Sequence, residues 1–216
     1  MIEIQDLSLE VNGNKIVTNA GLSVPAGAKV TLSGESGSGK TSLLKTIIGM
    51  IKPTRGRMVI DNLELNEKNL GAIRERMFYL PQDIRAFGDE TVAEFIEVPF
   101  TLKVQRGRKF SRKDALALFE ALRLKTGLFD QKLANMSGGE RKRVALVRGL
   151  LLKRPVLLLD EPTAAVDTEN RDNLVDVILG GASTTVLAVT HDSRFMERAT
   201  HRVVLRDGTL ATEEKG

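Results

Sequence analysis

Near the start of this chain hydrophobic residues occupy every second position in two short runs, which is the spacing of a half-buried β-strand. Asn12-Gly13-Asn14 follows as a hairpin signal. The segment from Ile2 to Val24 is therefore predicted to form short antiparallel strands. Polar residues separate its first hydrophobic positions, which are Ile2, Ile4, Leu7, Leu9 and Val11.

A strand, a glycine-rich loop and a helix come next. Lys29 to Ser33 has the composition of a strand, and Thr41 to Gly49 is the helix expected after the loop. Pro53 and Gly56 break that helix before a further strand, Arg57 to Ile60.

From about Asp83 to Pro155 the pattern becomes helical. Ser111-Arg112-Lys113-Asp114 resembles a capping box at a helix start. This region is predicted to be a helical insertion. The hydrophobic positions that then share one helical face are Ala115, Leu118, Phe119 and Leu122.

After Pro155 the alternation of strands and helices returns. The order is an apolar strand at 156–159, a helix from about Thr168 closed by Gly180-Gly181, a strand at 184–189, and a hairpin at Asp207-Gly208. The fold class is therefore predicted to be α/β with a mainly parallel sheet, an N-terminal antiparallel β portion and a helical insertion.

The amino-acid composition limits the kinds of partner that the protein is expected to bind. The 32 basic and 28 acidic residues are nearly balanced and interspersed, so nucleic acid is not the expected partner. The basic runs Arg106-Gly107-Arg108-Lys109 and Arg141-Lys142-Arg143 could touch phosphates, but solvated faces are the favoured interpretation. The absence of cysteine excludes disulfides and thiolate metal sites. No stretch approaches a membrane span, and the first residues lack a secretory signal, so any membrane role is expected to act through another chain.

The loop Gly34-Glu35-Ser36-Gly37-Ser38-Gly39-Lys40-Thr41 is a candidate phosphate cradle. Small residues let successive backbone N–H groups converge on phosphate oxygens. Lys40 adds a point charge for the β- and γ-phosphates, and the Thr41 hydroxyl is placed to bind Mg²⁺. Because a strand precedes the loop and a helix follows it, a chance glycine-rich turn is disfavoured.

Two carboxylates follow the apolar strand Val156 to Leu159. Such a strand is typical of the centre of a parallel sheet, so Asp160 and Glu161 are expected at its carboxyl end, where α/β sheets bind ligands. Asp160 fits a Mg²⁺ shell, directly or through water, and Glu161 is the candidate to polarise an attacking water.

Ser137 and Glu140 have the N-cap and N3 spacing of a capping box, with Gly138-Gly139 between them. The bare N–H groups of such a helix start could receive an anion. By itself, however, the spacing favours a simple capping box over an anion site.

In this order the motifs resemble those of the ATP-binding subunit of ABC transporters, over essentially the whole chain. The resemblance implies a P-loop NTPase core of the RecA-like type. It also implies the following motifs: Walker A at 34–41, a Q-loop at Gln82, a signature at 136–140, Walker B at 156–161, a D-loop at 164–167 and a switch histidine at His191.

The resemblance also implies residue roles. Gln82 senses Mg²⁺ and the water, His191 bonds the γ-phosphate and the attacking water, and Ser42 reaches the α-phosphate. The implied catalytic residues are Glu161, His191 and Gln82, and the implied metal residues are Thr41, Gln82 and Asp160. The implied nucleotide-binding residues are Val11, Gly34, Glu35, Ser36, Gly37, Ser38, Gly39, Lys40, Thr41, Ser42, Ser137, Gly138, Gly139, Glu140 and Asp167. His201 is interpreted as structural.

The cofactors implied are ATP and Mg²⁺. The partners implied are a second copy, joined head to tail by ATP, and a separate transmembrane permease. The expected location is the cytoplasmic face of the cell membrane. The single ABC domain (1–216) is expected to divide into a catalytic core (1–82 and 156–216) and a helical subdomain (about 83–155). Phe87 to Val92 with Pro99-Phe100 resembles the metal and iron export subgroup, with lipoprotein-release ATPases close.

The chain departs from the family pattern at a few positions. Val11 stands where the family usually has an aromatic that stacks on adenine, so affinity is expected to rest on the phosphates. Met136 and Glu140 replace leucine and glutamine in the signature.

Two other function classes stay open. One is a soluble ABC ATPase of DNA repair, chromosome structure or translation, although the chain lacks coiled-coil insertions, zinc cysteines and a second cassette. The other is a regulatory nucleotide-binding module without turnover, which the joint presence of Glu161, Gln82 and His191 disfavours.

Overall fold

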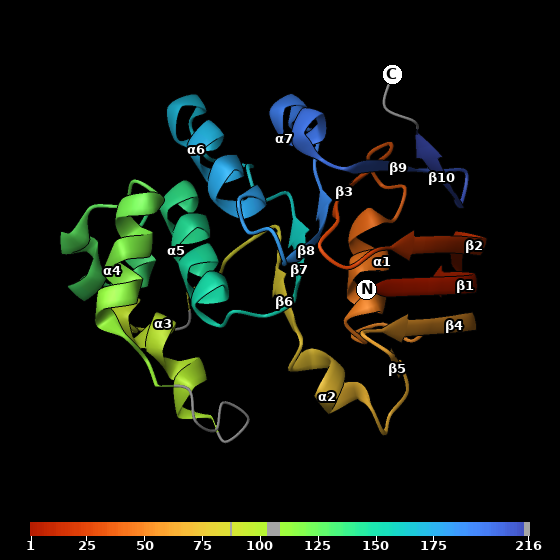
Figure 1. Cartoon of the computed structure of the whole chain (residues 1–216), viewed down its shortest axis with the longest axis horizontal. Helices are drawn as coiled ribbons and strands as arrows, with labels where there is room; N and C mark the ends of the chain where they lie inside the picture. Colours follow the sequence, from red (N-terminus) through yellow and green to blue (C-terminus); the bar gives the residue numbers. More distant parts are fainter. Residues whose placement is uncertain (87, 103–108, 214–216) are drawn as a thin grey trace. The chain divides into compact units, whose positions relative to one another are not determined.

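The computed structural model describes residues 1–86, 88–102 and 109–213 of the chain. Contacts divide it into two compact units. The strand unit contains 1–79, 154–162 and the chain from 181 onward, and the helical unit contains 80–153 and 163–180 (Figure 1). None of the helices in these described ranges has the length and hydrophobicity needed to cross a bilayer.

The strand unit begins with a four-stranded antiparallel sheet in the order β2-β1-β4-β5. Asn12 and Gly13 form the predicted hairpin turn, with φ angles of 53° and 78°. Of the alternating hydrophobic residues of β1, Ile2, Ile4, Leu7 and Leu9 are buried, as predicted, and Val11 at the end of the strand is partly buried. The strands are β1 (Ile2–Val11), β2 (Asn14–Val24), β4 (Arg55–Ile60) and β5 (Leu63–Glu64).

A six-stranded sheet follows the order β10-β9-β3-β8-β7-β6. β3 pairs in parallel with β8 and with β9, and β8 pairs in parallel with β7. Every residue of β7 and β8 is buried, which explains the apolar runs at 156–159 and 186–189. The strands are β3 (Lys29–Ser33), β6 (Met77–Leu80), β7 (Val156–Asp160), β8 (Thr185–Val189), β9 (His201–Arg206) and β10 (Thr209–Glu213).

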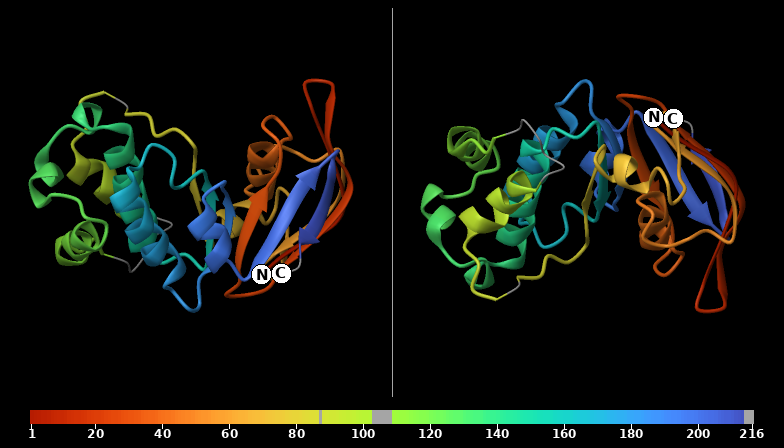
Figure 2. Two further views of the ribbon diagram at one scale, coloured as in Figure 1. Left: turned by 90° about the horizontal axis from the view of Figure 1, so that it is seen from above. Right: turned by 90° about the horizontal axis from the view of Figure 1, so that it is seen from below.

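One hydrophobic core joins these two sheets through helix α1 (Lys40–Ile47). Leu43, Leu44 and Ile47 of α1 pack in the same cluster as residues of β1, β3 and β7. Both views of Figure 2 show α1 beside these strands. The core therefore fixes the position of the loop from which α1 starts. The unit also contains α2 (Leu70–Arg74) and α7 (Ser193–Arg198).

The helical unit is built from segments on both sides of β7 in the sequence. Its core contains a tilted contact of Phe119 with Phe129, whose centroids lie 5.4 Å apart. Ser111 caps α4 by accepting from the N–H of Asp114. The helices are α3 (Val92–Thr101), α4 (Arg112–Ala121), η2 (Thr126–Asp130), η3 (Leu133–Asn135), α5 (Gly138–Leu151) and α6 (Thr168–Leu179).

The units have different bounds from the predicted core and helical subdomain. Residues 163–180, expected in the core, group with the helical unit. Contacts between α6 and the end of α4 account for this, because Asn173 Nδ2 donates to the carbonyl of Ala121 at 2.5 Å.

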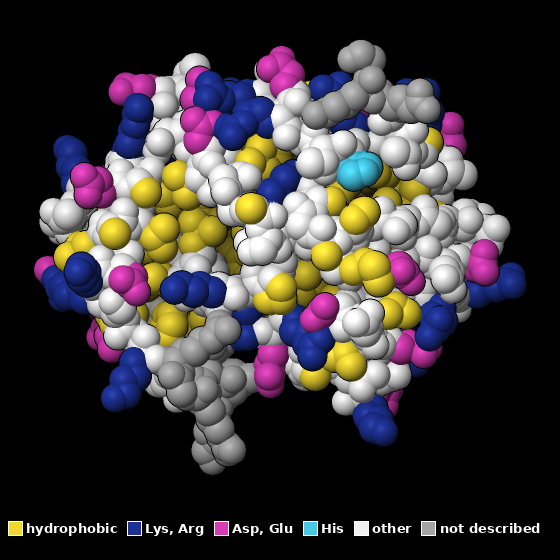
Figure 3. All heavy atoms as spheres, viewed as in Figure 1, with side chains coloured by type: hydrophobic (Ala, Val, Ile, Leu, Met, Phe, Trp, Pro, Cys, Tyr) yellow, Lys and Arg dark blue, Asp and Glu magenta, His cyan; other side chains and the backbone are white. Residues whose placement is uncertain are grey.

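Figure 3 shows both charge signs interspersed on one face, in keeping with the near-balanced composition. Of the sequence features named above, Phe87 and residues 106–108 lie outside the described ranges.

Candidate active site

The glycine-rich loop leaves β3 after Ser33 and enters α1 at Lys40. Gly34, Gly37 and Gly39 have φ angles of 146°, 79° and 100°, where a side chain is strained. A Cβ on Gly34 would also collide with the carbonyl oxygen of Leu205, and one on Gly39 with Ile16 Cγ2. The loop therefore needs glycine for its own conformation and packing, in addition to access for phosphate.

The start of α1 has no side-chain cap. Gly39 occupies the N-cap position, and the first turn contains no acidic residue. The first N–H groups of a helix have no intrahelical partners, and they carry the positive end of the helix dipole. This end of α1 is therefore suited to receive an anion.

Lys40 lies over the loop that precedes it. Its Nζ donates to the carbonyl oxygens of Gly34 at 2.9 Å and Glu35 at 2.7 Å, and the residue is 8% exposed. Ser38 Oγ is buried without a partner within the described residues. An ammonium group held on the loop and an unpaired hydroxyl fit a phosphate ligand.

Thr41 and Asp160 are brought together from α1 and the end of β7. Thr41 Oγ1 donates to Asp160 Oδ1 at 3.1 Å, and Asp160 is 1% exposed. The described residues contain no cluster of three or more histidine, cysteine or acidic residues that could hold a metal. Mg²⁺ at a phosphate site needs only one or two protein oxygens, because phosphates and waters complete its shell. The Thr41 and Asp160 oxygens fit this requirement.

Tyr79 of β6 is a neighbour of Asp160 that sequence reasoning missed. Its hydroxyl donates to Asp160 Oδ2 at 3.4 Å. Burial, the Asp160 charge and this hydrogen bond raise the pKa of Tyr79 above its usual value. The phenol therefore keeps its proton. The only available signal was a lone tyrosine in a strand, which does not reveal its partner.

Glu161 and His191 face each other at the ends of two neighbouring strands, β7 and β8. Glu161 Oε1 lies 3.8 Å from His191 Nε2, and the His191 side chain is 61% exposed. Glu161 has a φ of 49°, and its N–H donates to the carbonyl of Val189 at 2.9 Å. This backbone turn directs the carboxyl group toward His191. Sequence motifs alone could not show the pairing.

The remaining predicted residues of the strand unit lie on the loop, on α1 and at the end of β1. Glu35, Ser36 and Gly37 are exposed on the loop, and Ser42 is partly buried in α1. A pocket of about 380 Å³ is lined in part by Gly34, Glu35 and His191. Val11 is partly buried at the end of β1. His201 begins β9 and contacts the Thr200 hydroxyl through Nδ1 at 2.8 Å.

The signature residues belong to the helical unit and form the predicted capping box. Glu140 N donates to Ser137 Oγ at 3.2 Å, and Ser137 N donates to Glu140 Oε2 at 2.9 Å. The hydrogen bonds from the Ser137 backbone and hydroxyl lower the pKa of Glu140. An ionised carboxylate therefore lies at the start of α5. Gln82, also in the helical unit, is exposed.

The segment before α6 contacts the signature glycine. Gly139 is buried, and a Cβ on it would collide with the carbonyl oxygen of Ala165, whose φ is 61°. Asp167 caps α6 by accepting from Asn170 N at 3.1 Å. Hydrogen bonds from the Asn170 side chain and backbone lower the pKa of Asp167. The signature and the predicted D-loop are thus joined by backbone packing.

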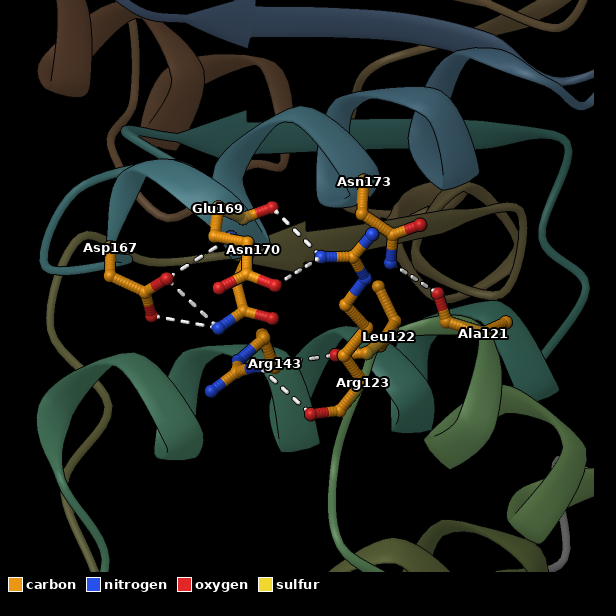
Figure 4. Close-up of polar contacts among 8 residues, drawn as sticks. All are labelled: Ala121, Leu122, Arg123, Arg143, Asp167, Glu169, Asn170 and Asn173. Atoms are coloured by element: carbon orange, nitrogen blue, oxygen red, sulfur yellow. Dashed lines mark hydrogen bonds and ion pairs between the residues drawn. The ribbon is translucent and has the colours of Figure 1, made fainter.

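The basic run Arg141-Lys142-Arg143 was predicted to be a solvated face, and this is wrong. Lys142 and Arg143 are buried. Arg143 donates to the carbonyl oxygens of Leu122 and Arg123, both at 3.2 Å, and so caps the end of α4 (Figure 4). Arg123 in turn contacts Glu169 Oε1 of α6 at 3.1 Å. Free carbonyls at a helix end offer a buried guanidinium its partners.

Comparison with known proteins identifies the family to which the chain is similar. The model of the family described as ABC transporter matches residues 17–164. The lipoprotein-releasing system ATP-binding protein LolD 1 of Chlorobium chlorochromatii is 35% identical over 93% of this chain and 84% of the relative. The glutamate/aspartate import ATP-binding protein GltL of Escherichia coli is 29% identical over 99% of this chain and 90% of the relative.

Comparison with solved structures identifies the same kind of protein. The ATP-binding cassette MJ0796, in a dimeric post-hydrolysis state bound to ADP and Pi, superposes with a TM-score of 0.89. It is 28% identical, and the match covers 100% of both chains. The predicted α/β fold, with its antiparallel N-terminal portion and helices, is thereby confirmed.

Proposed function

This chain belongs to the ABC transporter family as an ATP-binding subunit that hydrolyses ATP, and we propose that its glycine-rich loop, Asp160, Glu161 and His191 form the hydrolytic site. One observation carries the proposal. Thr41 meets Asp160 at 3.1 Å, and the next residue, Glu161, faces His191 at 3.8 Å. Groups for phosphate, metal and water thus share one end of the six-stranded sheet.

Binding is assigned to the loop and to α1. The N–H groups of residues 34–41 and the Lys40 ammonium hold the β- and γ-phosphates, and Ser42 reaches the α-phosphate. Thr41 and Asp160 would hold Mg²⁺, which neutralises charge on the phosphates, and Gln82 would sense the metal and the water. Because Val11 offers no aromatic ring, the phosphates supply most of the affinity.

Hydrolysis is assigned to Glu161 and His191. Glu161 accepts a proton from the attacking water, a role typically worth ~10²–10⁴-fold in rate. His191 donates a hydrogen bond to the γ-phosphate and orients the same water. Its proximity to Glu161 supports this division of roles.

Coupling to transport is assigned to a dimer. Ser137, Gly138, Gly139 and Glu140 of one copy would face the γ-phosphate bound by the other, with Asp167 nearby. The dimeric state of the similar cassette supports this arrangement. We place the dimer on a separate membrane permease, at the cytoplasmic face of the membrane. The predicted metal-export role stays a prediction, since the relatives above are named for lipoprotein release and amino-acid import.

Glu161→Gln is the direct test. The amide keeps the size of the side chain and cannot accept the proton, so ATP hydrolysis should fall ~10²–10⁴-fold while ATP binding persists. Phosphate release measures the first effect, and titration with a fluorescent ATP analogue measures the second. Light scattering should show an ATP-dependent dimer that persists.

Glu197→Gln, at an exposed position of α7, is the matched control and should hydrolyse ATP at the parent rate. A Glu161→Gln protein with parental turnover would contradict the assignment of the base. A monomer at high concentration with ATP bound would contradict the dimer.

A further inference from the structure

Tyr79 is the one tyrosine of a chain that has no tryptophan. It lies on β6, next to β7 in the sheet, and its hydroxyl donates to Asp160 Oδ2 at 3.4 Å. The predicted site contains no role for this side chain. Its contact is nevertheless with the carboxylate proposed to hold Mg²⁺.

The two oxygens of Asp160 have different donors. Oδ1 accepts from Thr41 at 3.1 Å, and Oδ2 accepts from Tyr79. Asp160 is 1% exposed, so water cannot readily replace either donor. The two contacts together fix the plane of the carboxylate.

Metal binding would change the hydrogen bond from Thr41 to Asp160 more than the one from Tyr79. Mg²⁺ uses hydroxyl and carboxylate oxygens as ligands, so Thr41 and Asp160 Oδ1 would turn toward the ion. The Tyr79 hydroxyl contacts the other oxygen and remains free to donate to it. Groups that donate to a ligating carboxylate orient it and tune metal affinity.

We propose that Tyr79 is a positioning residue that holds Asp160 Oδ2 so that Oδ1 and the Thr41 hydroxyl face Mg²⁺ beside the nucleotide. The inference rests on the proposed function, because it takes Asp160 as the metal ligand. It adds a residue that touches neither the phosphates nor the metal.

The first test is metal affinity in Tyr79→Phe, made in the Glu161→Gln background so that ATP is not consumed. Phenylalanine keeps the ring and removes only the hydroxyl. Loss of such an outer partner costs about 10- to 100-fold in metal affinity, and the long hydrogen bond places the expected loss near the lower value. Mn²⁺ titration followed by electron paramagnetic resonance measures it without turnover.

ATP affinity in the presence of a chelator is the matched readout. It should be the same in Tyr79→Phe and the parent, because the hydroxyl does not contact phosphate. A general packing defect would weaken binding with and without metal. Equal metal affinity in the two proteins would overturn the inference.

Tyrosine emission gives a second test that needs no substitution. The emission of this chain comes from Tyr79 alone, and a hydrogen bond to a carboxylate quenches a phenol. A cation bound to Oδ1 makes the carboxylate a weaker acceptor, so adding Mg²⁺ to the ATP-bound protein should raise the emission, and Asp160→Asn should raise it without metal and abolish the metal response. A parental response in Asp160→Asn would overturn the inference.

Failure of the proposed function gives a different result. If Thr41→Ala and Asp160→Asn both keep parental Mn²⁺ affinity, the metal site itself is wrongly assigned. If those two variants lose the metal while Tyr79→Phe does not, only the role of Tyr79 fails.

Discussion

The starts of α1 and α5 are both rich in glycine and differ in how their N–H groups are satisfied. At α1, Gly39 provides no side-chain cap, and no acidic residue lies in the first turn. At α5, Ser137 and Glu140 form a complete capping box. A phosphate entering the first site would meet N–H groups that no side chain caps, whereas one entering the second would meet a carboxylate.

This difference separates two tasks. The loop before α1 also has the Lys40 ammonium above it, so we assign the binding of the nucleotide's phosphates to the strand unit. The start of α5 is already stabilised by its own residues. It can therefore support a phosphate that is held elsewhere, and it is poorly suited to capture one alone.

Among the substitutions that test this difference between the two helix starts, Lys40→Ala should cause the largest change in affinity. It removes the charged hydrogen-bond donor of the loop, so ATP affinity should fall by about 1.5–3 kcal/mol, roughly 10- to 100-fold. Titration with a fluorescent ATP analogue measures the loss. Lys45→Ala, in the last turn of the same helix, is the control and should bind ATP normally. Parental binding by Lys40→Ala would remove the distinction between the two helix starts.

Val11→Tyr tests whether the phosphates alone supply affinity at the first site. A ring at this position should stack on adenine and tighten ATP by about 1 kcal/mol, the lower end of the range for stacked bases. Calorimetry would measure it, with inorganic tripolyphosphate as a ligand whose affinity should not change. Val11→Leu adds apolar bulk without a ring and should leave ATP affinity unchanged. Unchanged affinity in Val11→Tyr would show that adenine does not lie against this residue.

Glu140→Gln tests the start of α5 and should cause the smallest change in affinity of the three substitutions. The amide oxygen can keep the hydrogen bond from Ser137 while the negative charge disappears, so the helix start becomes more attractive to a phosphate by about 0.3–1 kcal/mol. In the Glu161→Gln background, the ATP-bound dimer should tighten about 2- to 5-fold by analytical ultracentrifugation. ATP affinity of the monomer should not move. A weaker dimer would mean that the Glu140 charge assists the interface.

Much of the fold could be predicted from local sequence. The alternation in β1, the strand before the glycine-rich loop and the apolar run of β7 each identify an element, because burial on one or both faces sets the spacing of hydrophobic residues. Ser137 and Glu140 predicted their capping box for a similar reason, since both partners lie within one helical turn.

Contacts between distant segments could not be predicted in this way. Thr41 and Asp160 are 119 residues apart, and Tyr79 and Asp160 are 81 apart. Arg143 was predicted to lie on the surface. A basic run in the sequence does not reveal that this side chain donates to the carbonyl oxygens of Leu122 and Arg123 at the end of α4.

The sequence by itself determined the order of the motifs, the glycine positions and the type of each element, because these depend on neighbouring residues and on the periodicity of burial. Only the tertiary structure decided that Tyr79 reaches Asp160, that Ile16 closes over Gly39 and that Ala165 requires glycine at position 139. These contacts join segments far apart along the chain, and their distances are set by how the sheets and helices pack.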